Sequence, residues 1–337
     1  MRIKDIGGEF GLIDRIRHTY SGSHGPLDDL SVGIGDDAAV FDPAGQHVVV
    51  TTDMLVEGVH FRRDWSDFYS IGWKAAAVNL SDIAGMGAEP TYAFISLAFG
   101  AGETVENMDR LYDGFVDCLN RYGARLAGGD TNSTPRNLVI SVTLLGRVPA
   151  GRALTRSGAR VGDHIVVTGT LGNSAAGLAL LIEAGLARAE KLDKDLVNIH
   201  RRPQPRITAS RVAAVTDGVH AAMDLSDGLA GDLAKLCHAS GVGAVVHAAS
   251  LPISDSARRV AEMVGKDPNT FALHGGEDYE LLLSVAPDAS AGLIRSLMEA
   301  GVPATVIGEM TKQGLRLETD EASEDLAAAG GWDHFRS

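Results

Sequence analysis

Several features that define common protein classes are scarce in this chain. It has two cysteines, Cys118 and Cys237, and no CxxC pair, so a disulfide framework or a structural zinc site is not expected. No apolar run is long enough to span a bilayer, and the N-terminal stretch MRIKDIGGEFGLIDRI lacks the apolar region of a signal peptide. We therefore expect an intracellular protein of the reducing cytoplasm.

Positive charge is also in deficit. The chain carries 30 Lys and Arg against 44 Asp and Glu, a formal net charge of −14. This balance argues against binding to nucleic acids or anionic membranes, which requires a basic surface. If the ligands are phosphates, divalent cations must hold them, because the charge of bound metal ions reverses the local electrostatics.

The best-known catalytic motifs are missing from the sequence. There is no nucleophile elbow of a Ser/His/Asp hydrolase, no cysteine in a recognisable nucleophile setting, and no dinucleotide-binding GxGxxG. The turn GTLGNS, at residues 169–174, has the glycines of an anion site but lacks the lysine of a Walker A loop. An ordinary connection between a strand and a helix is therefore the favoured interpretation of this turn.

What remains is a chain of 337 residues, longer than a usual single domain. Hydrophobic residues make up 45% of it, which is enough for packed cores, and 40 glycines indicate many tight turns. We place a domain boundary at the Pro149-Ala150-Gly151 turn, which gives domains at residues 1–148 and 149–337. Both are expected to mix helices and strands, an α/β class of the α+β type.

Hydrophobic periodicity and turn residues define the expected elements. Residues 18–30 and 311–330 are predicted to be irregular, and the GGDTN segment is predicted to be a turn. Helices are predicted at residues 9–17, 71–86, 103–122, 173–187, 206–215, 227–239 and 291–300. Strands are predicted around the turn at residues 42–45 and at residues 92–99, 138–148, 164–168, 221–225, 242–247, 279–285 and 304–307.

The most informative stretch runs from Gly33 to Phe61. It places Asp36 and Asp37 in a glycine-rich turn, and an apolar run then leads into Thr51, Thr52 and Asp53. Carboxylate and hydroxyl oxygens are hard ligands that suit Mg²⁺. The alternative is that Asp36 and Asp37 only form a turn, because aspartate bonds readily to its own backbone.

Similar acidic sites recur along the chain, and this recurrence favours a shared function. Asp82 falls on the buried stripe of its predicted helix, where a lone carboxylate is costly without a cation or strong donors. Asp227 is explained equally well as the N-cap of its helix, whereas a cap explains neither Asp224 nor Ser226. The other acidic sites beside small residues are Asp130, Glu277 and Asp278.

Two basic residues stand out beside these acids. Arg156 lies in a patch with Arg152 and Arg160 and matches a polyphosphate bidentately, although a solvated loop explains the patch equally well. His60, just past Asp53, suits either a phosphate contact or a structural hydrogen bond. Phosphoryl transfer needs mainly positioning and charge neutralisation, which this set of residues provides.

Nine motifs together carry a family resemblance. The segments GEFGLIDRI, GIGDDAAV, TTDMLVEGVHF, AVNLSDIAGMGAEP, GGDTN, GRALTRSGARVGD, TGTLGNSAAGL, MDLSDGL and HGGEDYEL occur in this order. The chain thereby resembles the thiamine-monophosphate kinase family, within the superfamily of aminoimidazole ribonucleotide synthetase and selenophosphate synthetase. The resemblance covers nearly the whole chain and is weak at residues 18–30 and 311–330.

This resemblance implies ATP-dependent phosphorylation of thiamine monophosphate in a homodimer, with several Mg²⁺ ions. It implies a two-domain fold whose N-terminal sheet pairs across the dimer and whose C-terminal domain is α/β. The implied magnesium ligands are Asp37, Thr51, Thr52, Asp53, Asp82, Asp130, Asp224 and Asp227. The implied nucleotide contacts are Tyr112, Gly129, Arg156 and Ser226, and the implied thiamine-phosphate contacts are His60, Glu277 and Trp332.

Two other functions remain open at this point. Another ATP-using member of the superfamily would act on a different acceptor, although this chain lacks the N-terminal or C-terminal cysteine of two such relatives. A non-catalytic binder of magnesium nucleotide or thiamine phosphates would use the same residues without turnover.

Overall fold

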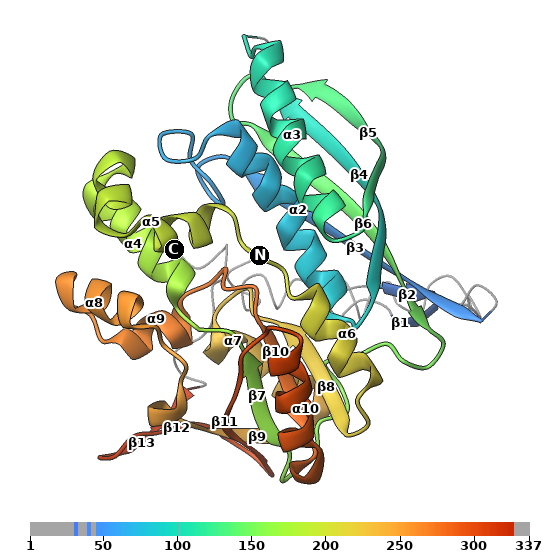
Figure 1. Ribbon diagram of the computed structural model, residues 1–337, viewed down its shortest axis with the longest axis vertical. Helices are drawn as coiled ribbons and strands as arrows, with labels where there is room; N and C mark the ends of the chain where they lie inside the picture. The colour runs from blue at the N-terminus through green and yellow to red at the C-terminus, as the bar shows by residue number, and fades with distance from the viewer. Residues whose placement is uncertain (1–29, 33–38, 42–44, 101, 327–337) are drawn as a thin grey trace, which may run out of the picture.

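The computed structural model describes residues 30–32, 39–41, 45–100 and 102–326. Three of the predicted features lie outside these residues: the helix at 9–17, nearly all of the loop at 18–30, and the 42–44 part of the first turn. Asp36, Asp37 and Trp332 also lie outside them. Two mixed sheets form the body of the described structure, each with helices packed against it (Figure 1).

The first sheet has the strand order β1-β2-β3-β6-β4-β5. All neighbours are antiparallel except β4 and β5. β2 pairs with the start of β3 through Ala39 and Val50, as the strand–turn–strand prediction for this stretch requires. The strands are β1 (Leu30–Val32), β2 (Ala39–Phe41), β3 (Gln46–Val56), β4 (Glu89–Phe99), β5 (Arg125–Ser133) and β6 (Val139–Pro149).

Helices α2 (Phe68–Gly85) and α3 (Val105–Arg121) lie beside this sheet (Figure 1). Asp67 caps α2 by accepting a hydrogen bond of 2.7 Å from the amide of Ser70. Most of α2 is buried, because it also packs against β8 and α6 of the second half. Its small residues Ala75, Ala76 and Ala77 suit this position between two layers.

The second sheet has the order β13-β12-β9-β11-β7-β10-β8, and only its β12–β9 pair is parallel. β7 is the strand that the sequence predicted at residues 164–168. The strands are β7 (His164–Thr168), β8 (Val219–Asp224), β9 (Gly243–His247), β10 (Leu281–Val285), β11 (Ala304–Thr311), β12 (Leu315–Glu318) and β13 (Ser323–Asp325).

Helices cover both faces of the second sheet. One face shares a hydrophobic core with α2, α6, α10 and the first sheet, and the other packs on α4, α7, α8 and α9. The helices are α4 (Asn173–Ala184), α5 (Leu186–Arg201), α6 (Ile207–Val215), α7 (Leu229–Ser240), the short 3₁₀ helix η2 (Ala248–Ser250), α8 (Asp255–Met263), α9 (Pro268–His274) and α10 (Pro287–Glu299). The two halves therefore meet through a continuous core along α2.

Three secondary-structure predictions were wrong. GGDTN is not a turn but part of β5, because its backbone pairs with β4, with Ile95 opposite Gly129. The predicted helix at residues 173–187 ends at Gly185, whose φ is 68°, and a second helix, α5, follows. Residues 311–330 contain β12 and β13, which extend the second sheet.

Within the described residues, no helix combines the length and the hydrophobicity that a membrane crossing requires. Both cysteines are free and buried.

Candidate functional site

The end of β3 separates two predicted ligands onto opposite faces. Successive strand residues alternate in direction, so Thr51 and Asp53 share one face and Thr52 lies on the other. The buried hydroxyl of Thr51 donates to the carboxylate of Asp82 on α2. The hydroxyl of Thr52 donates instead to the carbonyl oxygen of Val142 at 2.9 Å, within the sheet. Thr51 is thus joined to a second predicted ligand, whereas the side chain of Thr52 is not on that face.

A second pair of residues joins the two halves of the chain. Asp224 is the last residue of β8 and is only 2% exposed. Its carboxylate accepts a hydrogen bond of 2.6 Å from the hydroxyl of Ser81, which directly precedes Asp82 on α2. α2 thereby carries one predicted ligand, Asp82, and through the adjacent Ser81 binds another, Asp224 of the second half.

The loop after β8 is held by a residue that the sequence analysis did not select. The amides of Ser226 and Asp227 both donate to one oxygen of Asp232 at 2.9 Å, and its other oxygen accepts from Lys235 at 2.8 Å. Burial raises the pKa of Asp232 to about 6, and the charge of Lys235 opposes this shift. A lysine three residues after an aspartate in LAGDLAKL was the available signal, but it is typical of a surface helix.

Asp227 does not cap the helix that follows it, so this alternative was wrong. α7 begins at Leu229 and its N-cap is Gly228, whose φ of 94° suits glycine. The carboxylate of Asp227 contacts the ammonium of Lys235 instead. Helix capping therefore does not explain why an aspartate stands at residue 227.

Tyr279 marks the point where the acidic groups converge. Its buried hydroxyl has a pKa well above the usual value, raised first by burial and then by the charges of nearby carboxylates. These carboxylates come from both halves of the chain and belong to Glu277, Asp53, Asp224 and Asp227. The charges of four predicted site residues, from both halves of the chain, therefore act on one buried hydroxyl.

The segment before β10 is bound tightly to the loop after β8. Glu277 and Tyr279 adopt positive φ angles of 66° and 51°, which non-glycine residues rarely do. Their amides donate 2.8 Å hydrogen bonds to the carbonyl oxygens of Ser226 and Leu225. The predicted acceptor contact Glu277 thus lies directly against the predicted nucleotide contact Ser226.

His60 has a structural hydrogen bond in addition to any ligand that it binds. Its Nδ1 accepts from the amide of Val56 at 3.0 Å, which fixes the turn after β3. Its carbonyl oxygen accepts from Lys74 at 3.0 Å, and Lys74 also contacts Glu277. Two predicted acceptor contacts are therefore connected through one lysine, which the sequence analysis did not select.

The remaining predicted contacts lie on other elements. Gly129 and Asp130 are exposed on the edge strand β5, and Tyr112 is partly buried in α3 against the first core. Arg156 lies in the connection before β7, and its carbonyl oxygen accepts from Ser240 at 2.8 Å. Their relation to the converging carboxylates stays a prediction.

The glycine-rich turn at residues 169–174 proves to be a connection between a strand and a helix. Asp278 occupies the start of α4, where it accepts from the amides of Gly172 at 2.7 Å and Ser174 at 3.3 Å. Burial raises the pKa of Asp278 to about 8. The chain thus supplies the acidic group at this helix N-terminus itself.

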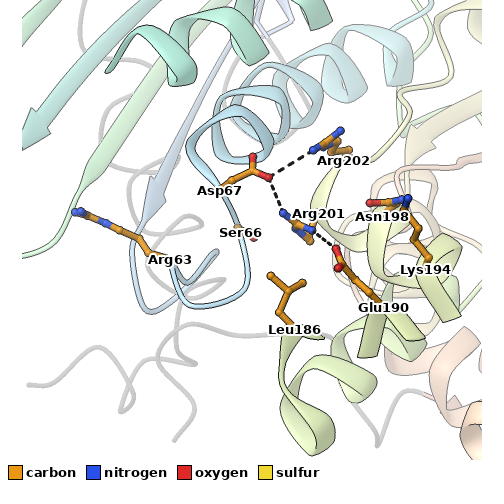
Figure 2. A pocket seen from close by; sticks show the side chains of 9 residues that line it. All are labelled: Arg63, Ser66, Asp67, Leu186, Glu190, Lys194, Asn198, Arg201 and Arg202. Atoms are coloured by element: carbon orange, nitrogen blue, oxygen red, sulfur yellow. Dashed lines mark hydrogen bonds and ion pairs between the residues drawn. The ribbon is translucent and has the colours of Figure 1, made fainter. Parts of the chain in front are cut away.

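A cavity of about 480 Å³ lies between the start of α2 and helix α5 (Figure 2). None of the site residues predicted from the sequence lines it. Asp67 forms ion pairs with Arg201 at 2.8 Å and Arg202 at 3.6 Å, and Arg201 also pairs with Glu190 at 3.1 Å. These pairs link the two halves of the chain. The basic residues of the wall outnumber the acidic ones: Arg63, Lys194, Arg201 and Arg202 face only Asp67 and Glu190.

Among the residues that the structure describes, no three His, Cys, Asp or Glu side chains are grouped closely enough to hold a metal ion. The acidic groups instead approach in pairs with hydroxyl groups, Thr51 with Asp82 and Ser81 with Asp224.

The matches between this chain and known proteins extend over almost its whole length. Two family models match it, "AIR synthase related protein, N-terminal domain" at residues 35–148 and "AIR synthase related protein, C-terminal domain" at residues 160–320. Thiamine-monophosphate kinase from Escherichia coli (strain K12) is 42% identical over 97% of this chain and 98% of its own length.

Two solved structures are similar over the same extent. One, described as "AaThiL complexed with AMPPCP and TMP", has a TM-score of 0.84 at 34% identity and covers 99% of each chain. Thiamine-monophosphate kinase from Stenotrophomonas maltophilia K279a has a TM-score of 0.76 at 39% identity, covering 93% of this chain and 98% of its own.

Proposed function

The chain belongs to the thiamine-monophosphate kinase family, and from this premise we propose how this thiamine-phosphate kinase works. The terminal phosphoryl group of ATP moves to a phosphate oxygen of thiamine monophosphate, which gives thiamine diphosphate and ADP. The acceptor oxygen attacks in line and the bond to the ADP oxygen breaks. That oxygen is already ionised at neutral pH, so the transfer needs no catalytic base, and positioning with charge neutralisation supplies the catalysis.

The observation that carries this proposal is the convergence of acidic groups from both halves around Tyr279. Asp53 comes from β3, Asp224 ends β8, Asp227 lies in the loop after β8, and Glu277 precedes β10. Two anionic substrates would be repelled by such a site unless cations lie between them. The acidic composition that excludes nucleic acid thus fits a site for phosphates held by metal ions.

Several Mg²⁺ ions fit the residues that are present. Mg²⁺ takes oxygen ligands and is usually held by one or two carboxylates, with water and substrate phosphates in its other positions. Carboxylate–hydroxyl pairs such as Thr51 with Asp82 provide such a donor set without a group of three acidic side chains. When bound, the ions would neutralise charge on the phosphates during transfer.

We assign the side chains to three roles on this basis. Asp53, Asp82 and Asp224 hold metal ions from the two sides of the junction between the halves. Arg156 contacts the polyphosphate, where its guanidinium would stabilise charge that develops on the transferred group. The full proposed set of metal ligands is Asp37, Thr51, Asp53, Asp82, Asp130, Asp224 and Asp227; Thr52 is not kept in it, because its hydroxyl donates to Val142 on the other face of the sheet. The proposed nucleotide contacts are Tyr112, Gly129, Arg156 and Ser226, and the proposed acceptor contacts are His60, Glu277 and Trp332.

A turnover assay tests the proposal directly. Purified protein, ATP, Mg²⁺ and thiamine monophosphate are followed for ADP and thiamine diphosphate, and Asp53→Asn is compared with wild type. We expect product from wild type and a loss on the order of 10²-fold or more in the variant, because transition-state charge is no longer neutralised. Asp64→Asn is the matched control, since Asp64 is an exposed carboxylate that pairs with Arg62.

Each outcome separates the rival functions. Binding of both ligands without product would favour the non-catalytic binder. ATP consumption that depends on a different acceptor would favour another member of the superfamily. Full activity in Asp53→Asn would contradict the metal assignment.

We further propose a homodimer formed through the first sheet. The face of this sheet opposite α2 carries the large exposed side chains Met54, Tyr92 and Phe94, which are 58%, 54% and 40% exposed. A second copy covering this face would bury them. Tyr92→Glu combined with Phe94→Glu should convert a dimer to a monomer in sedimentation analysis, and a wild-type monomer would contradict the proposal.

We also propose that the protein works in the reducing cytoplasm. The free thiols of Cys118 and Cys237 support this compartment, because disulfides are rare there. Fractionation of cells with an antibody to the native protein tests it, and recovery in the membrane or periplasmic fraction would contradict it.

A further inference from the structure

Lys74 is a buried cation at the junction of three segments that are far apart in the sequence. Its side chain is 3% exposed and lies in the second turn of α2. Its ammonium donates to the carbonyl oxygen of His60 at 3.0 Å and to the carboxylate of Glu277 at 2.8 Å. A buried ammonium is costly unless it is paired and hydrogen-bonded, so these two contacts account for its presence.

The carboxylate that Lys74 contacts is held in an unusual backbone conformation. Glu277 has a φ of 66°, and its amide donates to the carbonyl oxygen of Ser226 at 2.8 Å. Left-handed backbone at a non-glycine residue persists only where the surroundings determine it, and such residues cluster at ligand sites. The backbone of Glu277 is therefore fixed by the loop after β8, while its side chain is fixed by α2.

A histidine completes the surroundings of this carboxylate. His200 is 5% exposed, and its Nδ1 lies 3.3 Å from Glu277 and 3.1 Å from the hydroxyl of Ser174. Burial, followed by the charge of Lys74, lowers the pKa of His200 to about 3, so its ring is neutral at neutral pH. Lys74 therefore contributes positive charge at Glu277, whereas His200 contributes only a polar contact.

From this geometry we propose that Lys74 is a positioning residue for the acceptor: it holds the His60 turn and the Glu277 carboxylate at a fixed separation across the two halves of the chain. The inference rests on the proposed function, in which His60 and Glu277 contact thiamine monophosphate. Lys74 itself acts through these two residues. Without it, Glu277 would lose its ionic partner and turn toward solvent, and the His60 turn would lose its link to α2.

Calorimetric titration with thiamine monophosphate and, separately, with ATP and Mg²⁺ tests this role. We expect Lys74→Met to weaken acceptor binding by about tenfold or more, the factor that corresponds to one misplaced hydrogen-bonded group. ATP affinity should remain close to that of wild type. Lys74→Arg, which keeps a charged donor, should recover part of the lost acceptor affinity. A merely structural role of Lys74 would instead weaken the binding of thiamine monophosphate and of ATP alike.

Arg206→Met is the matched control. Arg206 also pairs with a buried carboxylate of the same segment, Glu280, with its Nε donating at 2.6 Å. This variant should lower the melting temperature while leaving the affinity for thiamine monophosphate unchanged. If Lys74→Met does not fold, Lys74→Gln removes the charge but keeps a donor, and the same criteria apply to it.

Two results would overturn the proposal. The first is a folded Lys74 variant that binds thiamine monophosphate as tightly as wild type, and the second is an equal loss of affinity for ATP and acceptor. A failure of the proposed function appears instead in wild type, which would bind thiamine monophosphate without forming product. A wild type that does not bind thiamine monophosphate at all would overturn both.

Discussion

Ser81 of α2 donates a 2.6 Å hydrogen bond to the carboxylate of Asp224 at the end of β8, although 143 residues separate them in the sequence. Ser81 is fully buried and Asp224 is 2% exposed, so the hydrogen bond from this hydroxyl replaces hydration of the carboxylate by water. Hydrogen bonds to charged groups are stronger than neutral ones, and here one of them ties a helix of the first half to a strand of the second. The acidic groups around Tyr279 meet at this junction.

Asp224→Asn should separate chemistry from stability at this junction. Asparagine keeps the shape of the side chain but removes the charge, so we expect kcat/KM to fall on the order of 10²-fold, as for other losses of charge neutralisation. Ser81→Ala removes only the hydroxyl and should lower the free energy of unfolding by about 1–2 kcal/mol. Steady-state kinetics with thiamine monophosphate and urea unfolding measure the two effects. A fully active Asp224→Asn enzyme would show that this carboxylate neither holds a metal ion nor orients the site.

Thr51→Val and Thr52→Val should differ, although the two residues are adjacent and the substitution is the same. The Thr51 hydroxyl donates to Asp82, whereas that of Thr52 donates to a carbonyl oxygen within the sheet. If the Thr51 hydroxyl orients Asp82, its loss should lower kcat by about tenfold, which corresponds to about 1.4 kcal/mol. Thr52→Val should change the rate less. Assays across a range of Mg²⁺ concentrations check this, and an equal or larger defect in Thr52→Val would contradict the difference in orientation.

The elements that position the site were largely predictable from hydrophobic pattern. The period of Ile71, Ala75 and Val78 located α2, and the apolar run at Val48 predicted the strand that carries Asp53. Asp82 was expected on the buried stripe of α2 but is only partly buried, while its neighbours Ser81 and Ile83 are buried. These signals are local, since each depends on residues that are neighbours in the sequence. The acidic residues at the ends of these elements were selected for the same reason.

The residues that support the site could not be selected in this way. Lys74 and Asp232 lie inside helices and look like ordinary surface charges until the fold buries them against partners from other segments. Asp227 followed by a glycine looked like a helix N-cap, yet the helix starts after Gly228. GGDTN contains residues typical of turns, but pairing with β4 overrides this local preference. Contacts between distant segments decide each of these cases.

Gly129→Ala should destabilise the edge of the first sheet. A Cβ atom at this position would lie 1.9 Å from the carbonyl oxygen of Ile95 in β4, so the strand backbone must move. We expect the free energy of unfolding to fall by roughly 1–3 kcal/mol, the usual cost of overpacking, and ATP affinity to fall with it if Gly129 contacts the nucleotide. Gly102→Ala is the control, because its Cβ would meet nothing within 4 Å. Urea unfolding together with ATP titration measures both effects, and a Gly129→Ala variant as stable as wild type would contradict the close packing of β5 on β4.

His200 should make the stability of the protein depend on pH in the acid range. Burial lowers its pKa from 6.5 in the unfolded chain to about 3 in the folded protein. Between these values His200 binds more protons in the unfolded state, so its own contribution to stability rises with pH, whereas the raised pKa values of Asp278 and Asp232 act in the opposite direction. His200 alone should contribute a slope of about 1.4 kcal/mol per pH unit in this window, with its full effect present above pH 6.5 and lost progressively toward pH 3.

His200→Gln should therefore remove this one contribution and make the measured slope less positive by about 1.4 kcal/mol per pH unit than in wild type, because glutamine keeps a polar group beside Ser174 and Glu277 but does not titrate. Ser174→Ala is the control, since it deletes the 3.1 Å contact to the ring while the imidazole stays buried, and it should keep the wild-type slope. Urea unfolding at intervals from pH 4 to pH 7 measures the three proteins. If His200→Gln retained the wild-type slope, the ring would have to be protonated in the folded state, and the 3.3 Å contact with Glu277 would then be an ion pair.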